Sequence, residues 1–546
     1  MSRPASRIIA GAVAVLVAAA SLTACASQQP AASGGDAAGD PVTGGTLTYL
    51  EYQTYTNLYP PQAGFYPNGG LVNNITARLT WQNPETLEIE PWVATEWTVN
   101  DDATEYTFDL RDDVTFSDGT PLDAAAVAKN FDTYGLGTPD LGLTVSEAIN
   151  NYASSEVVDA DTVTFRFSAP APGFLQATST INSGLLSPAT LDRTLEEFGA
   201  GNAADIIGTG PFTITDEKLG TELTLEARDD YDWAPPSSEH QGRAYLDTIH
   251  LIVTPEDSVR IGSLLSGQAD YIRYVQAFDE ARVESGGFDL YAPQTRGVNN
   301  SLSLRFTNPI LSDIKVRQAL VAGVDSQEVV DTVFTANYPR ATSALSSTAL
   351  GYKDESEYYE YDPKKAAKLL DQAGWDEGAD GIREKDGQRL SLDVYEAKAQ
   401  PLSKQTLELV SQQLKKIGVE LNVKSADAGS YAEDIKDPLK TPLYHSMVGR
   451  ADLDVIKSQY YTKNRNTLLS DDAKLDELLL AVASTADPDA RVEASQAVQD
   501  YLAEQAYVIP LFEEPQVYGA APYVQGIEFE SVARPLFYDV WLDKKK

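Results

Sequence analysis

The sequence predicts an α/β protein with two or more lobes. Apolar residues alternate with polar ones in some segments, as in a half-buried strand, and recur at helical spacing in others. Helical segments run into strand segments through single glycines, which is typical of α/β lobes. With one cysteine in 546 residues no intrachain disulfide can form, so core burial alone must stabilise the fold. Roughly 500 residues can supply that core in two or more domains.

The first elements are a short strand, a second strand and a helix. The first strand is expected at 47–51, and the next at 105–110, where Tyr, Phe and Leu alternate with Glu, Thr and Asp. A turn at Asp118-Gly119 precedes a helix that begins near Asp123. The apolar face of that helix consists of Ala124, Val127 and Phe131.

Helix signals are sharper in the second half of the chain. Asp362-Pro363 provides an N-cap and a first helical residue, and Gly374 marks the end of that helix. The next helix carries apolar residues over 407–417, and Gly418 leads directly into a strand at 419–423. The same start signal recurs at Asp487-Pro488.

The N-terminus has the pattern of a bacterial lipoprotein signal peptide. Arg3 and Arg7 form a basic region, 8–20 is uncharged, and Leu22-Thr23-Ala24 precedes the single cysteine, Cys25. The alternative is a structural cysteine in a transmembrane helix. The apolar run is shorter than the about 20 residues that a span needs, which favours the signal peptide.

We therefore predict a lipoprotein signal peptide at 1–24, lipidation of Cys25 and a flexible linker at 25–43, which is rich in Ala, Ser, Gly and Asp. The lipid would attach the protein to the extracytoplasmic face of the cell membrane, in a periplasm or at a cell surface.

The strong negative charge limits the possible partners. The formal net charge is −39, and because the two arginines of the leader contribute +2, the remainder carries −41. Such a field repels phosphate backbones and anionic lipid surfaces, so nucleic-acid binding is excluded. Two interpretations stay open: a solvated acidic surface that keeps the protein soluble, or an attraction for cationic solutes.

The sequence shows no catalytic constellation and no metal site. The three histidines, His240, His250 and His445, lack the spacing of a zinc site, and the first two are expected to be structural. His445 could contact a solute or a metal, but a lone histidine lacks the further ligands of a metal site. No Gly-x-Ser-x-Gly elbow is present. We expect no catalytic residues, metal or cofactor, which disfavours an extracellular hydrolase, the alternative from another functional class.

Several motifs follow one another in a specific order along the chain. They are Ala94-Thr95-Glu96-Trp97, the run from Thr104 to Arg111, the run from Val114 to Ala124, Gly208-Thr209-Gly210-Pro211-Phe212, Ser266-Gly267-Gln268-Ala269-Asp270, the run from Asp313 to Leu320, Tyr361-Asp362-Pro363, Ala373-Gly374-Trp375 and Val508-Ile509-Pro510-Leu511-Phe512. Together they resemble the extracellular solute-binding proteins, family 5, of peptide and nickel ABC importers.

This resemblance implies a two-lobed periplasmic-binding-protein-like fold (type II, with an extra subdomain) and a hinge between the lobes. It places the core of lobe 1 at 44–75, 205–290 and 510–546, the extra subdomain at 76–204 and lobe 2 at 291–509. The implied function is that of a monomeric receptor that captures a peptide or peptide-sized charged solute and delivers it to an ABC permease. A sensory or chaperone-like lipoprotein on the same fold is the alternative.

The resemblance also indicates ligand-binding residues in the first lobe. Five tyrosines crowd the first strand and the following loop, where the family has its cleft, and a tyrosine offers an apolar face with a polar hydroxyl. We predict ligand contacts for Tyr52, Gln53 and Tyr55, and expect at least two of the five tyrosines to pack inside the lobe. The five are Tyr49, Tyr52, Tyr55, Tyr59 and Tyr66.

In the second lobe, Asp452 matches by position the aspartate that pairs with the ligand's α-amino group in peptide-binding relatives. Such a charge-assisted bond contributes about 1.5–3 kcal/mol. The residues around it, including Leu453-Asp454-Val455, depart from the family pattern. Arg450 could instead bind a carboxylate, or pair with Asp452 in the cleft wall. The other predicted ligand-binding residues of this lobe are Asn299, Tyr444 and His445.

Overall fold

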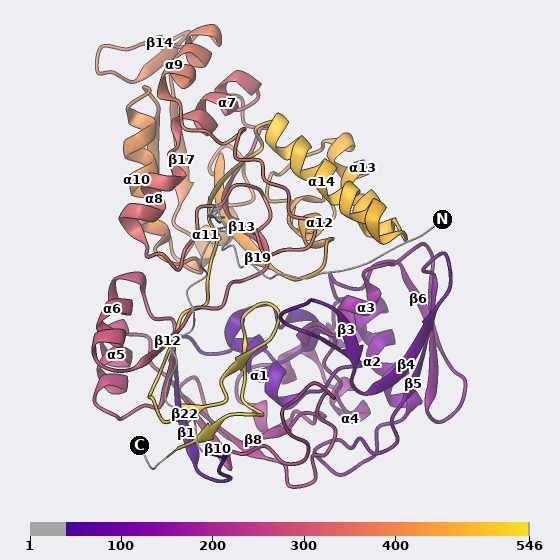
Figure 1. Ribbon diagram of the computed structural model, residues 1–546. Helices are drawn as coiled ribbons and strands as arrows, with labels where there is room; N and C mark the ends of the chain where they lie inside the picture. The colour runs from indigo at the N-terminus through magenta and orange to yellow at the C-terminus, as the bar shows by residue number, and fades with distance from the viewer. Residues whose placement is uncertain (1–39, 544–546) are drawn as a thin grey trace, which may run out of the picture. The chain divides into compact units, whose positions relative to one another are not determined.

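The computed structural model describes residues 40–543, and from Pro41 onward they belong to one compact unit. Three sheets of four or more strands organise this unit (Figure 1). Cys25, the predicted signal peptide and most of the predicted linker lie outside the described residues. Within residues 40–543, no helix combines the length and apolar character needed to cross a membrane.

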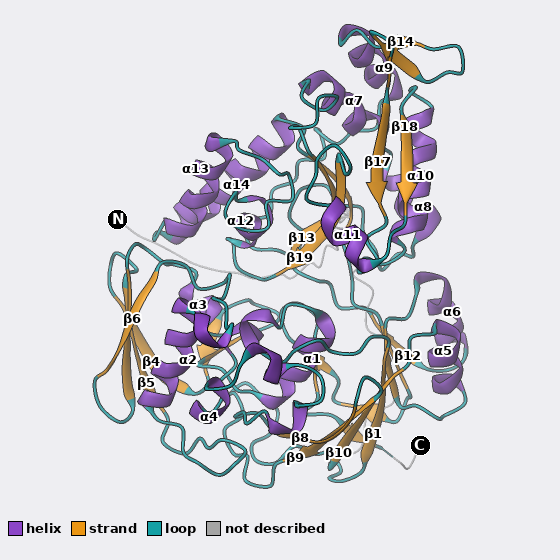
Figure 2. Ribbon diagram, turned by 180° about the vertical axis from the view of Figure 1, so that it is seen from behind, coloured by secondary structure: helices purple, strands orange, loops and turns teal. Residues whose placement is uncertain are grey.

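The first lobe is built on a seven-stranded mixed sheet. Its central strand β1 pairs in parallel with β10 and β11, and the strand order is β12-β21-β11-β1-β10-β9-β8. The figures place helices α5 and α6 beside β12 in both views (Figures 1 and 2). The elements are β1 (Thr46–Glu51), η1 (Pro60–Gln62), α1 (Tyr66–Ile75), β8 (Phe212–Lys218), β9 (Glu222–Ala227), β10 (Thr248–Val253), α5 (Asp257–Leu265), β11 (Tyr271–Arg273), α6 (Ala277–Ser285), β12 (Asp289–Tyr291), β21 (Tyr518–Ala520), β22 (Val524–Gln525), β23 (Glu528–Phe529), β24 (Pro535–Leu536) and β25 (Trp541–Leu542).

A smaller antiparallel sheet, β4-β5-β7-β6, forms an addition to this lobe. Phe131 and Phe174 each pack against Phe165, with ring centroids 4.8 Å and 5.4 Å apart, so aromatic side chains fill its core. The elements are β2 (Thr80–Gln82), β3 (Ile89–Pro91), β4 (Ala94–Val99), β5 (Glu105–Leu110), α2 (Ala124–Leu136), η2 (Pro139–Leu141), β6 (Tyr152–Val157), β7 (Thr162–Phe167), α3 (Phe174–Ala177), η3 (Ile181–Ser183), α4 (Pro188–Leu191), η4 (Leu195–Phe198) and η5 (Ala203–Asp205).

The second lobe is built on a five-stranded mixed sheet in the order β18-β17-β19-β13-β20. Its strand β13 is buried along its whole length and pairs antiparallel with β19 and β20. The elements are β13 (Gly297–Leu304), α7 (Ile314–Gly323), α8 (Ser326–Val333), α9 (Pro363–Gln372), β14 (Asp376–Glu377), β15 (Arg383–Lys385), β16 (Gln388–Arg389), β17 (Ser391–Tyr395), α10 (Ser403–Lys415), β18 (Glu420–Lys424), α11 (Ala428–Asp434), β19 (Leu443–Gly449), α12 (Val455–Tyr460), α13 (Ala473–Ser484), α14 (Pro488–Glu504) and β20 (Val508–Phe512).

Two short segments carry the chain between the lobes: the first crossover, 292–296, follows β12, and the second crossover, 513–517, follows β20. They pair antiparallel, since Thr295 N donates to Glu514 O and Gln516 N donates to Pro293 O, each at 2.9 Å. The predicted start of the returning lobe-1 segment, residue 510, falls within β20, which pairs with β13 in the second lobe. The chain therefore leaves the second lobe after Phe512.

The predicted α/β class is confirmed, and so are the helices with cap signals. Asp123 accepts a hydrogen bond from Ala126 N, Asp362 from Lys364 N and Lys365 N, and Asp487 from Ala490 N, so each satisfies backbone donors of a first turn. Gly418, at φ +85°, makes the turn from α10 towards β18 in a conformation that favours glycine.

Candidate ligand-binding site

A cavity of about 480 Å³ lies between the two lobes, and we call it the interlobe cavity. The first lobe contributes residues after β1, around the start of α1, in the loop 143–151 and at β11. The second lobe contributes the end of β19 and the loop after β17, and the second crossover contributes Glu514. A ligand here would contact both lobes and the segment that joins them.

Aromatic side chains form the first-lobe wall of the cavity. The ring of Tyr52 stacks on that of Tyr274, with centroids 4.1 Å apart and an interplanar angle of 15°. Tyr66 donates its hydroxyl hydrogen to Val532 O at 2.7 Å. The guanidinium of Arg273 lies 5.4 Å from the ring of Tyr52 and 4.9 Å from that of Tyr66. Ring stacking, a hydrogen bond and the contacts with Arg273 therefore hold the tyrosine rings in place.

Four arginines and two glutamates are the charged residues that line the cavity. Each arginine has a carboxylate within salt-bridge distance, so its charge is balanced by the protein itself. Arg450, which pairs with Asp454, also donates a hydrogen bond to Ser458 Oγ at 2.9 Å. The pairs are Arg273–Glu51 (2.7 Å), Arg534–Glu530 (3.3 Å), Arg465–Glu147 (3.7 Å) and Arg450–Asp454.

Glu514 is the lining carboxylate that forms no ion pair among the described residues. Its side chain accepts hydrogen bonds from Asn300 Nδ2 at 2.6 Å and from Gln516 Nε2 at 2.9 Å. The residue is 7% exposed, and burial raises the pKa of its carboxyl to about 7 against the weaker opposing effect of these hydrogen bonds.

Of the predicted ligand-binding residues, the structure brings Tyr52 and Arg450 together in the interlobe cavity. Gln53 and Tyr55 instead line a separate small pocket in the first lobe, where Tyr55 donates a hydrogen bond to Glu217 at 2.7 Å. Tyr49, Tyr55 and Tyr59 are buried in the lobe core. Tyr66, which was not among the predicted ligand-binding residues, does line the interlobe cavity.

Asn299, Tyr444 and His445 lie in the second-lobe sheet and do not line this cavity. Asn299 Nδ2 donates to the carbonyl oxygens of Ser343 and Leu345, at 3.0 Å and 2.8 Å. The ring of Tyr444 lies 4.7 Å from the guanidinium of Arg305, while Nδ1 of His445 lies 2.9 Å from Ser403 Oγ. Burial lowers the pKa of His445 to about 4, so its imidazole is neutral at pH 7. Their ligand contacts stay predictions.

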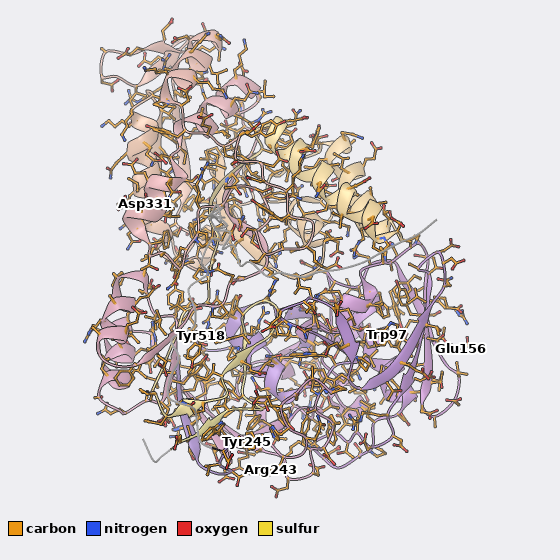
Figure 3. All side chains as sticks on the ribbon, viewed as in Figure 1. Trp97, Glu156, Arg243, Tyr245, Asp331 and Tyr518 are labelled. Carbon is orange, nitrogen blue, oxygen red and sulfur yellow. The ribbon has the colours of Figure 1, made fainter. Side chains whose placement is uncertain are left out.

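The other two histidines pack within the first lobe. His240 stacks between Tyr245 and Tyr538, with ring centroids 4.0 Å and 4.3 Å apart, and its Nδ1 lies 2.6 Å from Asp539. Figure 3 shows Tyr245 at the end of the first lobe that lies far from the second. His250 is in β10, and its Nε2 lies 3.2 Å from Glu222.

Asp452 has an internal partner. Arg491 donates to both of its carboxylate oxygens, through Nη1 at 3.0 Å and through Nη2 in a shorter contact. Burial alone would raise the pKa of Asp452, but the guanidinium and further hydrogen bonds hold it well below its usual range. A Cβ on Gly173 would lie 3.1 Å from both side chains, so the subdomain packs directly on this pair. Binding of a ligand amine by Asp452 stays a prediction and requires displacement of Arg491.

The loop 143–151 of the first lobe contacts the second lobe beside the cavity. Asn150 donates through Nδ2 to Asp454 at 2.7 Å and accepts from Lys457 Nζ at 2.7 Å. Glu147 of the same loop approaches Arg465 to 3.7 Å. The loop thus lines the cavity and joins the lobes at once.

Sequence reasoning missed Tyr274, Arg534 and Glu514. Of these, Glu514 has a usable signal: two consecutive glutamates follow the buried strand β20, where an acidic residue needs a specific partner. The sequence around Tyr274 and Arg534 has no comparable feature that would mark them as cavity residues.

Comparison with known proteins agrees with this architecture. The family "Bacterial extracellular solute-binding proteins, family 5 Middle" matches residues 88–462. The glutathione-binding protein GsiB of Salmonella paratyphi A (strain ATCC 9150 / SARB42) is 26% identical over 446 residues, which cover 79% of this chain and 82% of GsiB.

Solved structures extend the likeness to nearly the whole chain. NikA from Brucella suis, in complex with Fe(III)-EDTA, superposes with a TM-score of 0.76 at 27% identity and covers 91% of this chain and 100% of NikA. The oligopeptide-binding protein AppA from Bacillus subtilis, in complex with a nonapeptide, has a TM-score of 0.77 at 22% identity, over 92% of this chain and 100% of AppA. These likenesses confirm the two-lobed periplasmic-binding-protein fold. The chain therefore belongs to family 5 of the bacterial extracellular solute-binding proteins.

Proposed function

We propose that the protein is the receptor of an ABC importer, and that it captures a peptide or a peptide-sized charged solute in the interlobe cavity. The observation that carries the proposal is the cavity itself, because its volume of about 480 Å³ suits a small ligand and both lobes line it. GsiB, named for glutathione binding, and AppA, solved with a nonapeptide, support a peptide-like ligand.

The mechanism follows from this position. A ligand that contacts both lobes binds more tightly when they are together, so it shifts the population towards that state. The paired crossovers supply the connection about which the lobes would move. An ABC permease would then recognise the ligand-bound form. The proposal includes no chemical step, and the residues that line the described cavity include no serine, cysteine or histidine that could act as a nucleophile or base.

We predict that ligand binding stabilises the protein and reduces its radius of gyration. At a ligand concentration of 100 times Kd the stabilisation should reach about 2.7 kcal/mol, because the ligand binds the native state alone. Thermal unfolding and small-angle scattering, with ligand that co-purifies with the protein and is identified by mass spectrometry, measure both effects. Catalytic turnover of the bound solute would contradict the receptor proposal.

We further propose that a lipid on Cys25 holds a single copy of the receptor at the outer face of the membrane. The lone cysteine after Leu22-Thr23-Ala24 supports this. We predict that Cys25→Ala moves the protein from the detergent phase to the aqueous phase on Triton X-114 partitioning, with the thermal unfolding of the folded part unchanged. A mature N-terminus upstream of Cys25, found by mass spectrometry, would refute the anchor.

A further inference from the structure

We propose that Glu514 is the binding subsite for a positively charged group of the solute, so that the ligand class is one that carries an ammonium group. The proposal rests on the proposed receptor function and adds the residue and the charge that select the ligand. It differs from the prediction for Asp452, whose carboxylate is already paired with Arg491.

The distribution of charge around the cavity favours a cationic group near Glu514. All four lining arginines have carboxylate partners, and the other lining glutamate, Glu147, approaches Arg465. Glu514 is left as the one lining charge that the described residues do not balance by an ion pair. A buried carboxylate is costly without a counter-charge, so a cationic ligand group gains the attraction that the protein leaves unused.

The hydrogen bonds of the Glu514 carboxylate fix its position. Asn300 and Gln516 each donate to a different oxygen of Glu514, and both are neutral amides that fix the group without cancelling its charge. Each oxygen keeps lone pairs for a further donor. The other end of the Asn300 amide, Oδ1, is buried and has no hydrogen-bond partner within residues 40–543. An ammonium group has three donors, and the carboxylate can accept two of them.

Glu514 lines the same cavity as the tyrosines of the aromatic wall. Glu514 lies close enough to Tyr52, Tyr66 and Tyr274 for its charge to raise the pKa of each hydroxyl, although burial is the larger cause. The faces of Tyr52 and Tyr66 already contact the guanidinium groups of Arg273 and Arg534, at 4.7–5.4 Å, so the carboxylate and not a ring face is the place for an ammonium group. The surrounding rings lower the local dielectric constant and thereby strengthen the attraction of the carboxylate for a cation and its repulsion of an anion.

The position on the second crossover links this subsite to lobe closure. Glu514 O accepts the hydrogen bond from Thr295 N that pairs the two crossovers, while the Glu514 side chain bonds to Asn300 of β13. A cation bound there contacts the segment about which the lobes would move.

The subsite should also make binding depend on pH. The charged and titratable groups that face Glu514 are Arg273, Tyr52, Tyr66, Tyr274 and Tyr338. Burial raises the pKa of all four tyrosines above 10, and Arg273 stays charged, so Glu514 is the member of this group that titrates between pH 5 and 8. Its ionised form is the one that attracts an ammonium group.

The test uses a defined mixture of di- to pentapeptides with free amino termini, and the same mixture after N-acetylation. Equilibrium dialysis against the full protein, with mass-spectrometric readout, gives the relative affinity of each peptide. We expect the wild type to bind free-amine peptides and to bind their acetylated forms at least tenfold more weakly. Glu514→Gln should weaken binding of the free-amine forms about ten- to a hundredfold, as for one lost charge-assisted bond, and leave the acetylated forms unchanged.

Glu513→Gln is the matched control. Glu513 is the adjacent residue and is also buried, but it accepts hydrogen bonds from Ser347 N and Oγ at 2.9 Å and does not line the cavity. It should keep the wild-type preference. Glu514→Asp, which retains the charge, should keep the preference for free amines as well. If Glu514→Gln does not fold, the pH dependence of wild-type binding tests the subsite instead.

The outcomes separate the subsite from the receptor function. Equal binding of free and acetylated peptides by the wild type, or unchanged selectivity in Glu514→Gln, would overturn the subsite and leave the receptor standing. Binding of neither form would count against both proposals. Between pH 5.5 and 7, wild-type affinity for free-amine peptides should rise about tenfold while that for acetylated peptides stays flat. A flat profile for both would overturn the role of Glu514.

Discussion

Arg491→Met should destabilise the unliganded protein by about 3–5 kcal/mol, because it leaves the carboxylate of Asp452 buried without its partner. Asp452 is 6% exposed, Arg491 donates to both of its oxygens, and the subdomain packs over the pair at Gly173. Methionine keeps the length and apolar character of the arginine stem. Urea unfolding at neutral pH, extrapolated to water, measures the loss.

The control is the double variant Asp452→Asn with Arg491→Met, which removes both charges. It should recover most of the stability, since an amide costs less to bury than an unpaired carboxylate. If Arg491→Met lowers the free energy of unfolding by less than about 1 kcal/mol, the unpaired carboxylate of Asp452 reaches water because the lobes separate. The pair would then stabilise the contact between the lobes and contribute little to the global fold.

Glu514→Gln should stabilise the unliganded protein at pH 8 by up to about 3 kcal/mol, and should have little effect at pH 4. Burial raises the pKa of Glu514 from 4.5 to about 7, so between these values the native state binds more protons than the unfolded state. The contribution of the Glu514 carboxyl to the free energy of unfolding of the wild type is therefore fully present below pH 4.5 and is lost as the pH rises to 7. Glutamine carries no charge. Its amide N–H group would, however, face either Asn300 Nδ2 or Gln516 Nε2, which are also donors, and this mismatch reduces the increase in the free energy of unfolding.

Thermal and urea unfolding of both proteins from pH 4 to pH 8 provide the measurement. Glu408→Gln, at an exposed position of α10, serves as the control and should stay within about 0.5 kcal/mol of the wild type throughout. Parallel pH profiles for Glu514→Gln and wild type would contradict a buried carboxyl group that ionises near pH 7.

The sequence predicted the elements of the fold well where a local signal was sufficient. Asp362-Pro363 and Asp487-Pro488 define helix starts through contacts within one turn, and the alternation at 105–110 defines a strand whose alternate residues are buried. Such signals need no knowledge of the rest of the chain. The order of family motifs then supplied the arrangement in lobes, which local patterns do not contain.

The site was predicted less completely, because a cavity joins residues that are far apart in the chain. The partner of Asp452 is 39 residues away, at Arg491, while Arg450 pairs with Asp454 and not with Asp452, a pairing that the sequence had left open as one alternative. In β19, His445 contacts Ser403 in the interior, whereas Met447, two residues further on and near the end of the strand, lines the cavity. The local sequence does not show which distant residues come together in the folded protein.

Asn150 bonds to Asp454 and Lys457 across the lobes without lining the cavity, and this position separates two properties of a receptor. We expect a substitution there to change how often the lobes are joined without removing a side chain that lines the cavity. Since the apparent Kd is the intrinsic Kd divided by the joined fraction, the affinities for all ligands scale by one common factor. The concentration threshold for uptake can thus drift during evolution while the rank order of accepted solutes is preserved.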